Sequence, residues 1–141
     1  MACRVKVRLS TDKTVETSAL VNSGFESDDP DVVIPVELAR RLNLWPPHPN
    51  SELTELGTGG GDVIAPYYAA AALLELIAEG KTLKKLKVNI IVNPHVDEVI
   101  LSDAVAGELG IVLLDLKRGL WRLDSEAPDV VRPSSEKEEW R

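Results

Sequence analysis

Residues 67–92 constrain the fold most, because their second half is a clear strand and their first half decides whether a sheet can close around it. Apolar side chains fall at every second position from Leu86 to Val92, which predicts a strand over 82–92. The sequence of 67–78, YYAAAALLELIA, is rich in alanine, leucine and glutamate, and by propensity it predicts a helix. A buried strand is the alternative, because a short glycine turn would pair this segment with the next strand. A helix there would break a barrel and favour a small α+β domain.

Short strands and turns account for most of the remaining chain. Alternating or β-branched segments predict these strands. They are expected at residues 4–9, 14–21, 32–34, 99–101, 111–114 and 120–123. Pro35 and the apolar spacing after it predict a short helix over 35–42, and Ser102 and Gly110 are suited to cap the two ends of a second helix. Together, these expected strands and helices predict a mainly β domain, a closed or nearly closed β-barrel with one or two short helices.

The composition describes one acidic globular domain. The chain has 141 residues, a net charge of −7 and a sequence pI near 4.8, which argues against a nucleic-acid partner because such a partner needs a basic face. Its one cysteine, Cys3, excludes an intramolecular disulfide and gives no metal cluster. No apolar run is long enough for a membrane helix, and the first residues lack the apolar core of a signal peptide. We therefore expect a cytoplasmic protein without a membrane partner.

The C-terminal residues differ in composition from the rest of the chain. From Asp124 onward the sequence is polar, contains Pro128 and Pro133, and ends in SSEKEEWR. Such a segment has too few apolar side chains to order itself. We expect one folded domain over 1–123 and a loose, flexible tail over 124–141 unless a partner holds it.

A small polar turn follows the second predicted strand. Residues 19–26, ALVNSGFE, run from three apolar side chains straight into Asn22-Ser23-Gly24. Later in the chain, residues 57–61 form a glycine-rich stretch, and residues 99–102 include a short apolar run. The order and spacing of these features resemble a retropepsin, the single-domain aspartic peptidase of retroviral-protease type, in its prokaryotic and cellular branch. The resemblance covers roughly residues 4–123.

Each feature is similar to a part of that family's domain. Leu20 to Gly24 resemble its catalytic turn, in which two hydrophobic residues precede Asp, Thr or Ser, and Gly. The residues that resemble its glycine-rich flap are Gly57, Thr58, Gly59, Gly60 and Gly61. The run from Val99 to Ser102 is similar to the segment that threads through the active-site loop, although Ser102 stands where a glycine is common. Residues 103–110 resemble the helix after that segment, and 33–44 resemble the segment after the catalytic turn.

The resemblance implies a homodimer in which each chain supplies half of one site. Hydrolysis in this family needs two carboxylates that share one proton, and this chain has one candidate turn. A two-fold axis would bring two copies of position 22 together, with Ser23 and Gly24 as the supporting turn. The resemblance also implies an extended peptide or protein as substrate, covered by the flap, with water as the nucleophile. It implies no metal and no organic cofactor.

Asn22 stands where the family has its aspartate. An amide cannot act as a general base, so we expect the chain as written to be inactive as an aspartic endopeptidase. Three interpretations of Asn22 stay open: an engineered replacement of the aspartate, a natural pseudoenzyme, or a coincidental turn residue. The alternative function is a non-catalytic dimer that binds peptides or other proteins.

Two further features are interpreted as structural. Gly57 to Gly61 lack the lysine and the spacing of phosphate-binding loops, which favours a hairpin tip. His48 and His95 stand alone beside prolines, which is typical of loop residues. Neither feature is assigned a catalytic role.

Overall fold

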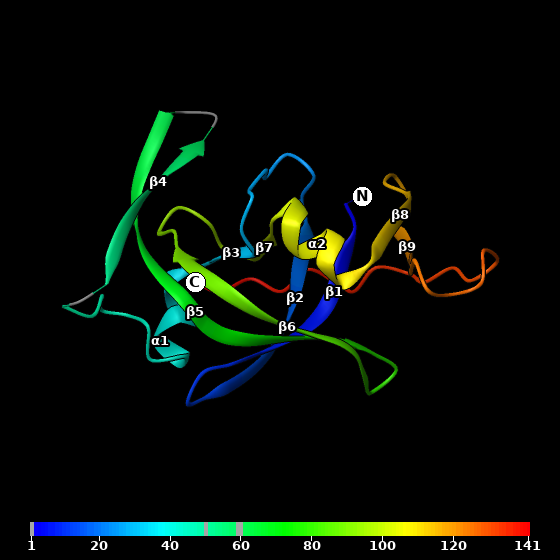
Figure 1. Ribbon diagram of the computed structural model, residues 1–141, viewed down its shortest axis with the longest axis horizontal. Coiled ribbons are helices and arrows are strands. Elements are labelled where there is room, and N and C mark those ends of the chain that lie inside the picture. Colours follow the sequence, from blue (N-terminus) through cyan, green and yellow to red (C-terminus); the bar gives the residue numbers. More distant parts are fainter. Residues whose placement is uncertain (1, 50, 59–60) are drawn as a thin grey trace.

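The sheet of this protein closes on itself. The computed structural model describes residues 2–49, 51–58 and 61–141, and Figure 1 shows its arrangement. In chain order the elements are β1 (Arg4–Ser10), β2 (Thr14–Val21), β3 (Asp31–Ile34), α1 (Val36–Arg41), β4 (Glu52–Thr58), β5 (Gly61–Ala78), β6 (Lys81–Val92), β7 (Val99–Leu101), α2 (Asp103–Leu109), β8 (Ile111–Asp115) and β9 (Leu120–Leu123).

Six strands form a closed barrel. They follow one another in the order β1-β2-β7-β3-β6-β5, and β5 pairs again with β1 to complete the ring. The β2–β7 and β3–β6 pairs are parallel and the other pairs in the ring are antiparallel, so the barrel is mixed. β4 lies outside the ring and pairs with the first half of β5, while β8 and β9 form a separate two-stranded sheet. The prediction of a mainly β domain with a closed barrel and two short helices is therefore confirmed.

The barrel interior is filled by side chains from alternating positions, as expected for strands with one face toward a core. In β1, the completely buried residues are Val5, Val7 and Leu9. The other strands of the ring contribute Ala19, Val21, Val32, Ile34, Leu74, Leu76, Val88, Ile90, Val92, Val99 and Leu101. The helices pack on the same core through Leu38 of α1 and through Val105 and Leu109 of α2.

Of the two alternatives for residues 67–78, the strand is correct and the helix that propensity favours is wrong, because these residues belong to the long strand β5. This strand forms a hairpin with β4 through its first half, and its second half lies between β1 and β6. Ala72, Leu74 and Leu76 are buried in the barrel. Helix propensities of ordinary residues differ by less than about 1 kcal/mol each, so two ladders of hydrogen bonds and a buried face outweigh them. Near Ala70, which has a φ of 47°, a register shift bends β5 between its two halves.

Both predicted helices are present, and the predicted caps hold the second. Pro35 precedes α1 in an extended conformation. The hydroxyl oxygen of Ser102 accepts a hydrogen bond from the backbone N–H of Val105 at 3.3 Å, and Gly110 ends α2 with a φ of 75°. This left-handed conformation suits glycine because it has no Cβ. In the described part of the chain, neither helix is long and apolar enough to cross a membrane.

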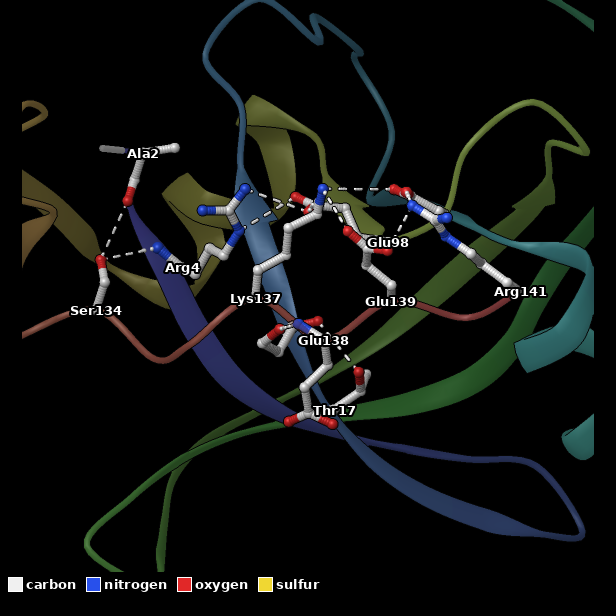
Figure 2. Close-up of polar contacts among 11 residues, drawn as sticks. Ala2, Arg4, Thr17, Glu98, Ser134, Lys137, Glu138, Glu139 and Arg141 are labelled. Carbon is white, nitrogen blue, oxygen red and sulfur yellow. Dashed lines mark hydrogen bonds and ion pairs between the residues drawn. The ribbon is translucent and has the colours of Figure 1, made fainter.

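The C-terminal segment, residues 124–141, lies against the barrel, whereas its composition predicts a loose tail. Its backbone joins the fold at several points. Arg132 pairs with Trp121 of β9, Ser135 donates its N–H to the carbonyl oxygen of Arg4 at 2.9 Å, and Trp140 donates its N–H to the carbonyl oxygen of Asp97 at 2.7 Å. Figure 2 shows the segment running beside β1 and β2. The small number of apolar side chains does not predict this arrangement, because backbone hydrogen bonds and ion pairs hold the segment together with the Trp140 side chain on the core.

The last residues of the segment bind two buried hydroxyl groups of β2. The backbone N–H of Glu138 donates to the Ser18 hydroxyl at 2.8 Å, and the indole N–H of Trp140 donates to the Thr17 hydroxyl at 2.9 Å. Both hydroxyl side chains are almost completely buried. The segment therefore satisfies polar groups that would otherwise be costly to bury.

Candidate functional site

The polar turn Asn22-Ser23-Gly24 directly follows β2 and is closed by its own asparagine. The side-chain oxygen of Asn22 accepts a hydrogen bond from the backbone N–H of Gly24 at 3.0 Å, and its backbone oxygen accepts one from Phe25 at 3.1 Å. A side chain at position 24 would be crowded, since a Cβ there would lie 3.2 Å from the Asn22 side-chain oxygen. The hydroxyl of Ser23 is exposed beside it. The sequence therefore forms a tight turn with two small residues at its outer side.

Strand β7 lies within the loop that carries this turn. Residues 22–30 connect β2 to β3, and β7 fills the space between these two strands, parallel to β2 and antiparallel to β3. The backbone N–H of Asn22 points to the carbonyl oxygen of Leu101 at 3.5 Å. The apolar run at 99–101 therefore packs beside the start of the turn and supports it.

The start of α2 holds the other end of the loop. Asp103 donates its backbone N–H to the carbonyl oxygen of Phe25 at 2.9 Å, and its carboxylate accepts the N–H of Ser27 at 2.9 Å. The N–H of Ser102 donates to the carbonyl oxygen of Asp31 at 3.2 Å. Ser102 is therefore accommodated as the buried cap of α2 and does not push the loop away from the turn.

A pocket of about 490 Å³ lies between the turn and the β4–β5 hairpin. Figure 1 shows the β2–β3 loop and this hairpin projecting from the same side of the barrel. Asn22 and Gly24 line one part of the pocket, and Thr54, Leu56 and Gly57 of β4 line another. The structure thus places Asn22 and Gly24 of the predicted turn and Gly57 of the predicted flap around one hollow.

The floor of the pocket is apolar and separate from the barrel core. It is made by side chains on the outer face of β3, β6 and β7, where Val33 pairs with Ile91 on one side and Ile100 on the other. Phe25, Leu56 and Val96 pack on the same cluster and also line the pocket. An extended peptide could therefore bury apolar surface here without entering the barrel.

The predicted flap residues have different positions. Gly57 lines the pocket, whereas Thr58 and Gly61 form the last backbone pair of the hairpin. Gly61 has a φ of 120°, which only glycine adopts readily. Gly59 and Gly60 lie outside the described residues. The prediction of a hairpin tip is supported by the β4–β5 register on both sides of it.

Sequence analysis missed the acidic character of this pocket. Three carboxylates line it, those of Glu26, Asp31 and Glu55, and none of the described lining residues is lysine, arginine or histidine. Asp31 is the most fixed of the three: one carboxylate oxygen accepts from the Ser27 hydroxyl at 2.6 Å, and the other accepts from the Asn89 amide at 3.0 Å. The signal in the sequence is an aspartate directly before the β-branched run at 32–34.

The two histidines take no part in the pocket. His48 contacts the carbonyl oxygen of Asn43 through its ring at 2.8 Å and packs edge-on against Tyr68. The backbone N–H of His95 donates to the Asn93 side chain at 2.9 Å. Within the described ranges, no group of three histidine, cysteine, aspartate or glutamate residues is placed to hold a metal ion.

The site is interpreted from its geometry, because neither a protein-family model nor a curated protein matches the chain. The arrangement can bind an extended chain through an apolar floor, polar rims and the edge of β4. As it stands it holds a neutral amide at the turn, which can donate and accept hydrogen bonds but cannot take a proton from water at ordinary pH.

Proposed function

We propose that this chain carries one half of a retropepsin-type aspartic endopeptidase site and binds extended peptides as a homodimer, without cleaving them while position 22 is asparagine. The observation that carries the proposal is the position of β7, which runs between β2 and β3 directly beneath the Asn22-Ser23-Gly24 turn. The turn and the β4–β5 hairpin line the same pocket. This arrangement supports a turn held rigidly enough to place a reacting group opposite a bound chain.

We infer a dimer because each chain has one candidate catalytic turn, whereas the reaction needs two. Acid-base hydrolysis of a peptide by this route needs two carboxylates, and each chain offers one position for them. A two-fold axis through the turns would place two copies of residue 22 side by side. Ser23 and Gly24 are exposed, and the Ser23 hydroxyl has no hydrogen-bond partner among the described residues. The hydroxyl is therefore available to bond to the partner's turn.

An extended peptide is proposed as the substrate because β4 is an edge strand of the sheet. β4 is the end strand of the seven-stranded sheet and pairs with β5 alone among the described strands. An extended partner would add one more strand by pairing with the outer backbone groups of β4, and residues 54–57 also line the pocket. An extended peptide can therefore bond to β4 through its backbone while its side chains reach the apolar floor.

The chemistry requires an aspartate at position 22. With two aspartates, one carboxylate takes a proton from a water molecule while the other donates a proton to the peptide carbonyl, and the water oxygen adds to the carbonyl carbon. The N–H of Gly24 already donates to the side-chain oxygen of Asn22. The same bond would hold a carboxylate in position and favour its charged form.

A second candidate is a natural binding dimer that never cleaves. It is favoured by the hydrogen bond between Asn22 and Gly24, because the amide closes the turn without needing a charge. In that case the pocket and the edge of β4 are used for recognition alone.

The test is the variant Asn22→Asp beside Asn22→Ala, which removes the amide without supplying a carboxylate. Each protein is incubated with a peptide library from pH 3 to pH 7, and its oligomeric state is measured by analytical ultracentrifugation. The proposal expects dimers in both variants and cleavage by Asn22→Asp alone. A dimeric Asn22→Asp that binds peptides but cuts none favours the binding dimer. A monomer at every concentration contradicts both candidates.

A further inference from the structure

We propose that the pocket selects peptides with a lysine or arginine side chain and that Asp31 binds the cationic group. This inference rests on the proposed function, since it concerns the peptide bound in the same pocket. It assigns to Asp31 a role in substrate selection rather than in hydrolysis.

The first support is the combination of an apolar floor with acidic walls. Val33, Ile91 and Ile100 form a continuous apolar row across three neighbouring strands. The charged residues at its edges are Glu26, Asp31 and Glu55, and the described lining residues include no cation to neutralise them. Lysine and arginine suit such a surface, because their stems lie on apolar groups while their heads reach a carboxylate.

The second support is the register of Asp31 with that row. Asp31 and Val33 are two residues apart on β3, so their side chains point to the same face of the sheet. Their paired neighbours on β6 are Asn89 and Ile91. The carboxylate therefore lies one pleat, roughly 6.6 Å, along the strand from the apolar row. A four-carbon lysine stem or an arginine stem can bridge that separation.

The third support is that Asp31 is held in place before any ligand arrives. Ser27 and Asn89 each donate a hydrogen bond to a different oxygen of its carboxylate. Asn89 is only 9% exposed, and its own side-chain oxygen accepts the backbone N–H of Ala70 at 2.8 Å. Each carboxylate oxygen has a second acceptor position, so both can still receive hydrogen bonds from a guanidinium or ammonium group.

A neighbouring tyrosine is consistent with a negative potential at this end of the sheet. The pKa of Tyr67 on β5 is raised, first by burial and then by the charges of Asp31, Asp29 and Glu52. A negative potential that disfavours a phenolate favours a bound cation for the same reason.

The test measures peptide binding to the chain with its own Asn22. A library of extended peptides that varies one position at a time among arginine, lysine, norleucine and glutamate is titrated against the protein by fluorescence anisotropy. We expect one position at which arginine or lysine binds roughly tenfold more tightly than norleucine. Asp31→Asn should remove that preference at the same position. Glu108→Gln is the matched control, because Glu108 is an exposed carboxylate of α2 that does not line the pocket, and it should keep the full preference.

The outcomes separate this inference from the proposed function. If Asn22→Asp cleaves peptides and shows no preference for a basic residue, the inference is wrong and the peptidase proposal stands. If basic peptides bind and Asp31→Asn removes the preference while Asn22→Asp cleaves nothing, the inference stands and the peptidase proposal fails. If no peptide binds, or if Asp31→Asn keeps the full preference in a protein with an unchanged circular dichroism spectrum, the role of Asp31 is refuted.

Discussion

The side-chain oxygen of Asn22 accepts the backbone N–H of Gly24 at 3.0 Å, so the residue at the proposed catalytic position also closes its own turn. An aspartate can accept the same hydrogen bond, whereas an alanine cannot. We expect Asn22→Ala to lower the free energy of unfolding by about 1 kcal/mol, the typical net value of one hydrogen bond, and Asn22→Asp to leave it nearly unchanged at pH 7. Urea denaturation of the two variants measures the difference. Equal losses in both would show that the bond does not support the turn.

The C-terminal segment should stabilise the barrel although it is mostly polar. Figure 2 shows Lys137, Glu139 and Arg141 gathered beside Glu98, which also receives two hydrogen bonds from Arg4, at 3.3 and 3.2 Å. Removal of residues 134–141 would expose Thr17 and Ser18 and leave their hydroxyls without partners from the segment. The exposed hydroxyls would bond to water instead, so we expect a loss of a few kcal/mol: about 0.5–1.5 kcal/mol for each lost hydrogen bond, together with the lost packing of Trp140 on the core and the lost ion pair of Lys137 with Glu98.

The reactivity of the Cys3 thiol should depend on the same segment. This thiol is 1% exposed, and burial raises its pKa while the neighbouring Ser134 lowers it in part. The truncated chain should therefore react with a thiol reagent faster than the intact chain at the same pH. Glu136→Ala, an exposed change within the segment, is the control and should react as slowly as the intact chain. An unchanged rate after truncation would mean that the segment does not cover Cys3.

Two glycines near α2 should respond in opposite directions to alanine. Gly110 has a φ of 75°, and a Cβ there would lie within 3.1 Å of all three terminal atoms of the Asp124 carboxylate. Gly107 is inside the helix, and a Cβ there meets no atom within 4 Å. Gly110→Ala should destabilise the fold by more than about 1 kcal/mol, and Gly107→Ala should stabilise it by about 0.5–1 kcal/mol. Thermal melting of both variants tests the pair, and a stabilised Gly110→Ala would contradict the structure.

Acid should weaken the contact between Glu126 and Arg132. The hydrogen bond from Arg132, at 2.5 Å, and the N–H of Leu123 lower the pKa of Glu126 from 4.5 to about 2. A lowered pKa in the folded state contributes stability above the ordinary pKa, and this contribution is lost as the pH falls toward the folded value. Glu126→Gln should therefore be less stable than the parent at pH 6, and the difference should shrink between pH 4.5 and about 2. Denaturant midpoints at constant ionic strength measure it, and a difference that does not depend on pH would contradict the ion pair.

Features with a local cause are predicted well from the sequence. The alternation in β1 follows from one buried and one exposed face, and the same period appears in the burial of Val5, Val7 and Leu9. In β6 the alternating sequence predicts the strand correctly, although residues 88–92 are buried on both faces. The ends of α2 are also local, because Ser102 bonds to a backbone group three residues away and Gly110 supplies the left-handed conformation that ends the helix.

Features with a long-range cause are not predicted. Residues 67–78 form a strand because β1 and β6 flank them, and β1 is distant in the sequence. Asp31 becomes part of the site through Asn89, which is 58 positions away. Trp140 finds its partner Thr17 at a separation of 123 residues. Composition and periodicity contain none of these pairings, so the fixed carboxylate and the bound C-terminal segment become visible only in the folded chain.

A mixing titration tests the shared half-site most directly. Asn22→Asp and the parent chain are combined at constant total concentration, allowed to exchange subunits, and assayed for peptide cleavage. If the active site needs an aspartate from each chain, activity follows the square of the Asn22→Asp fraction. An equal mixture then keeps about one quarter of the full rate, because random pairing gives that fraction of dimers an aspartate at position 22 in both chains. An equal mixture that keeps half of the rate, or an Asn22→Asp protein without activity, would contradict the shared site.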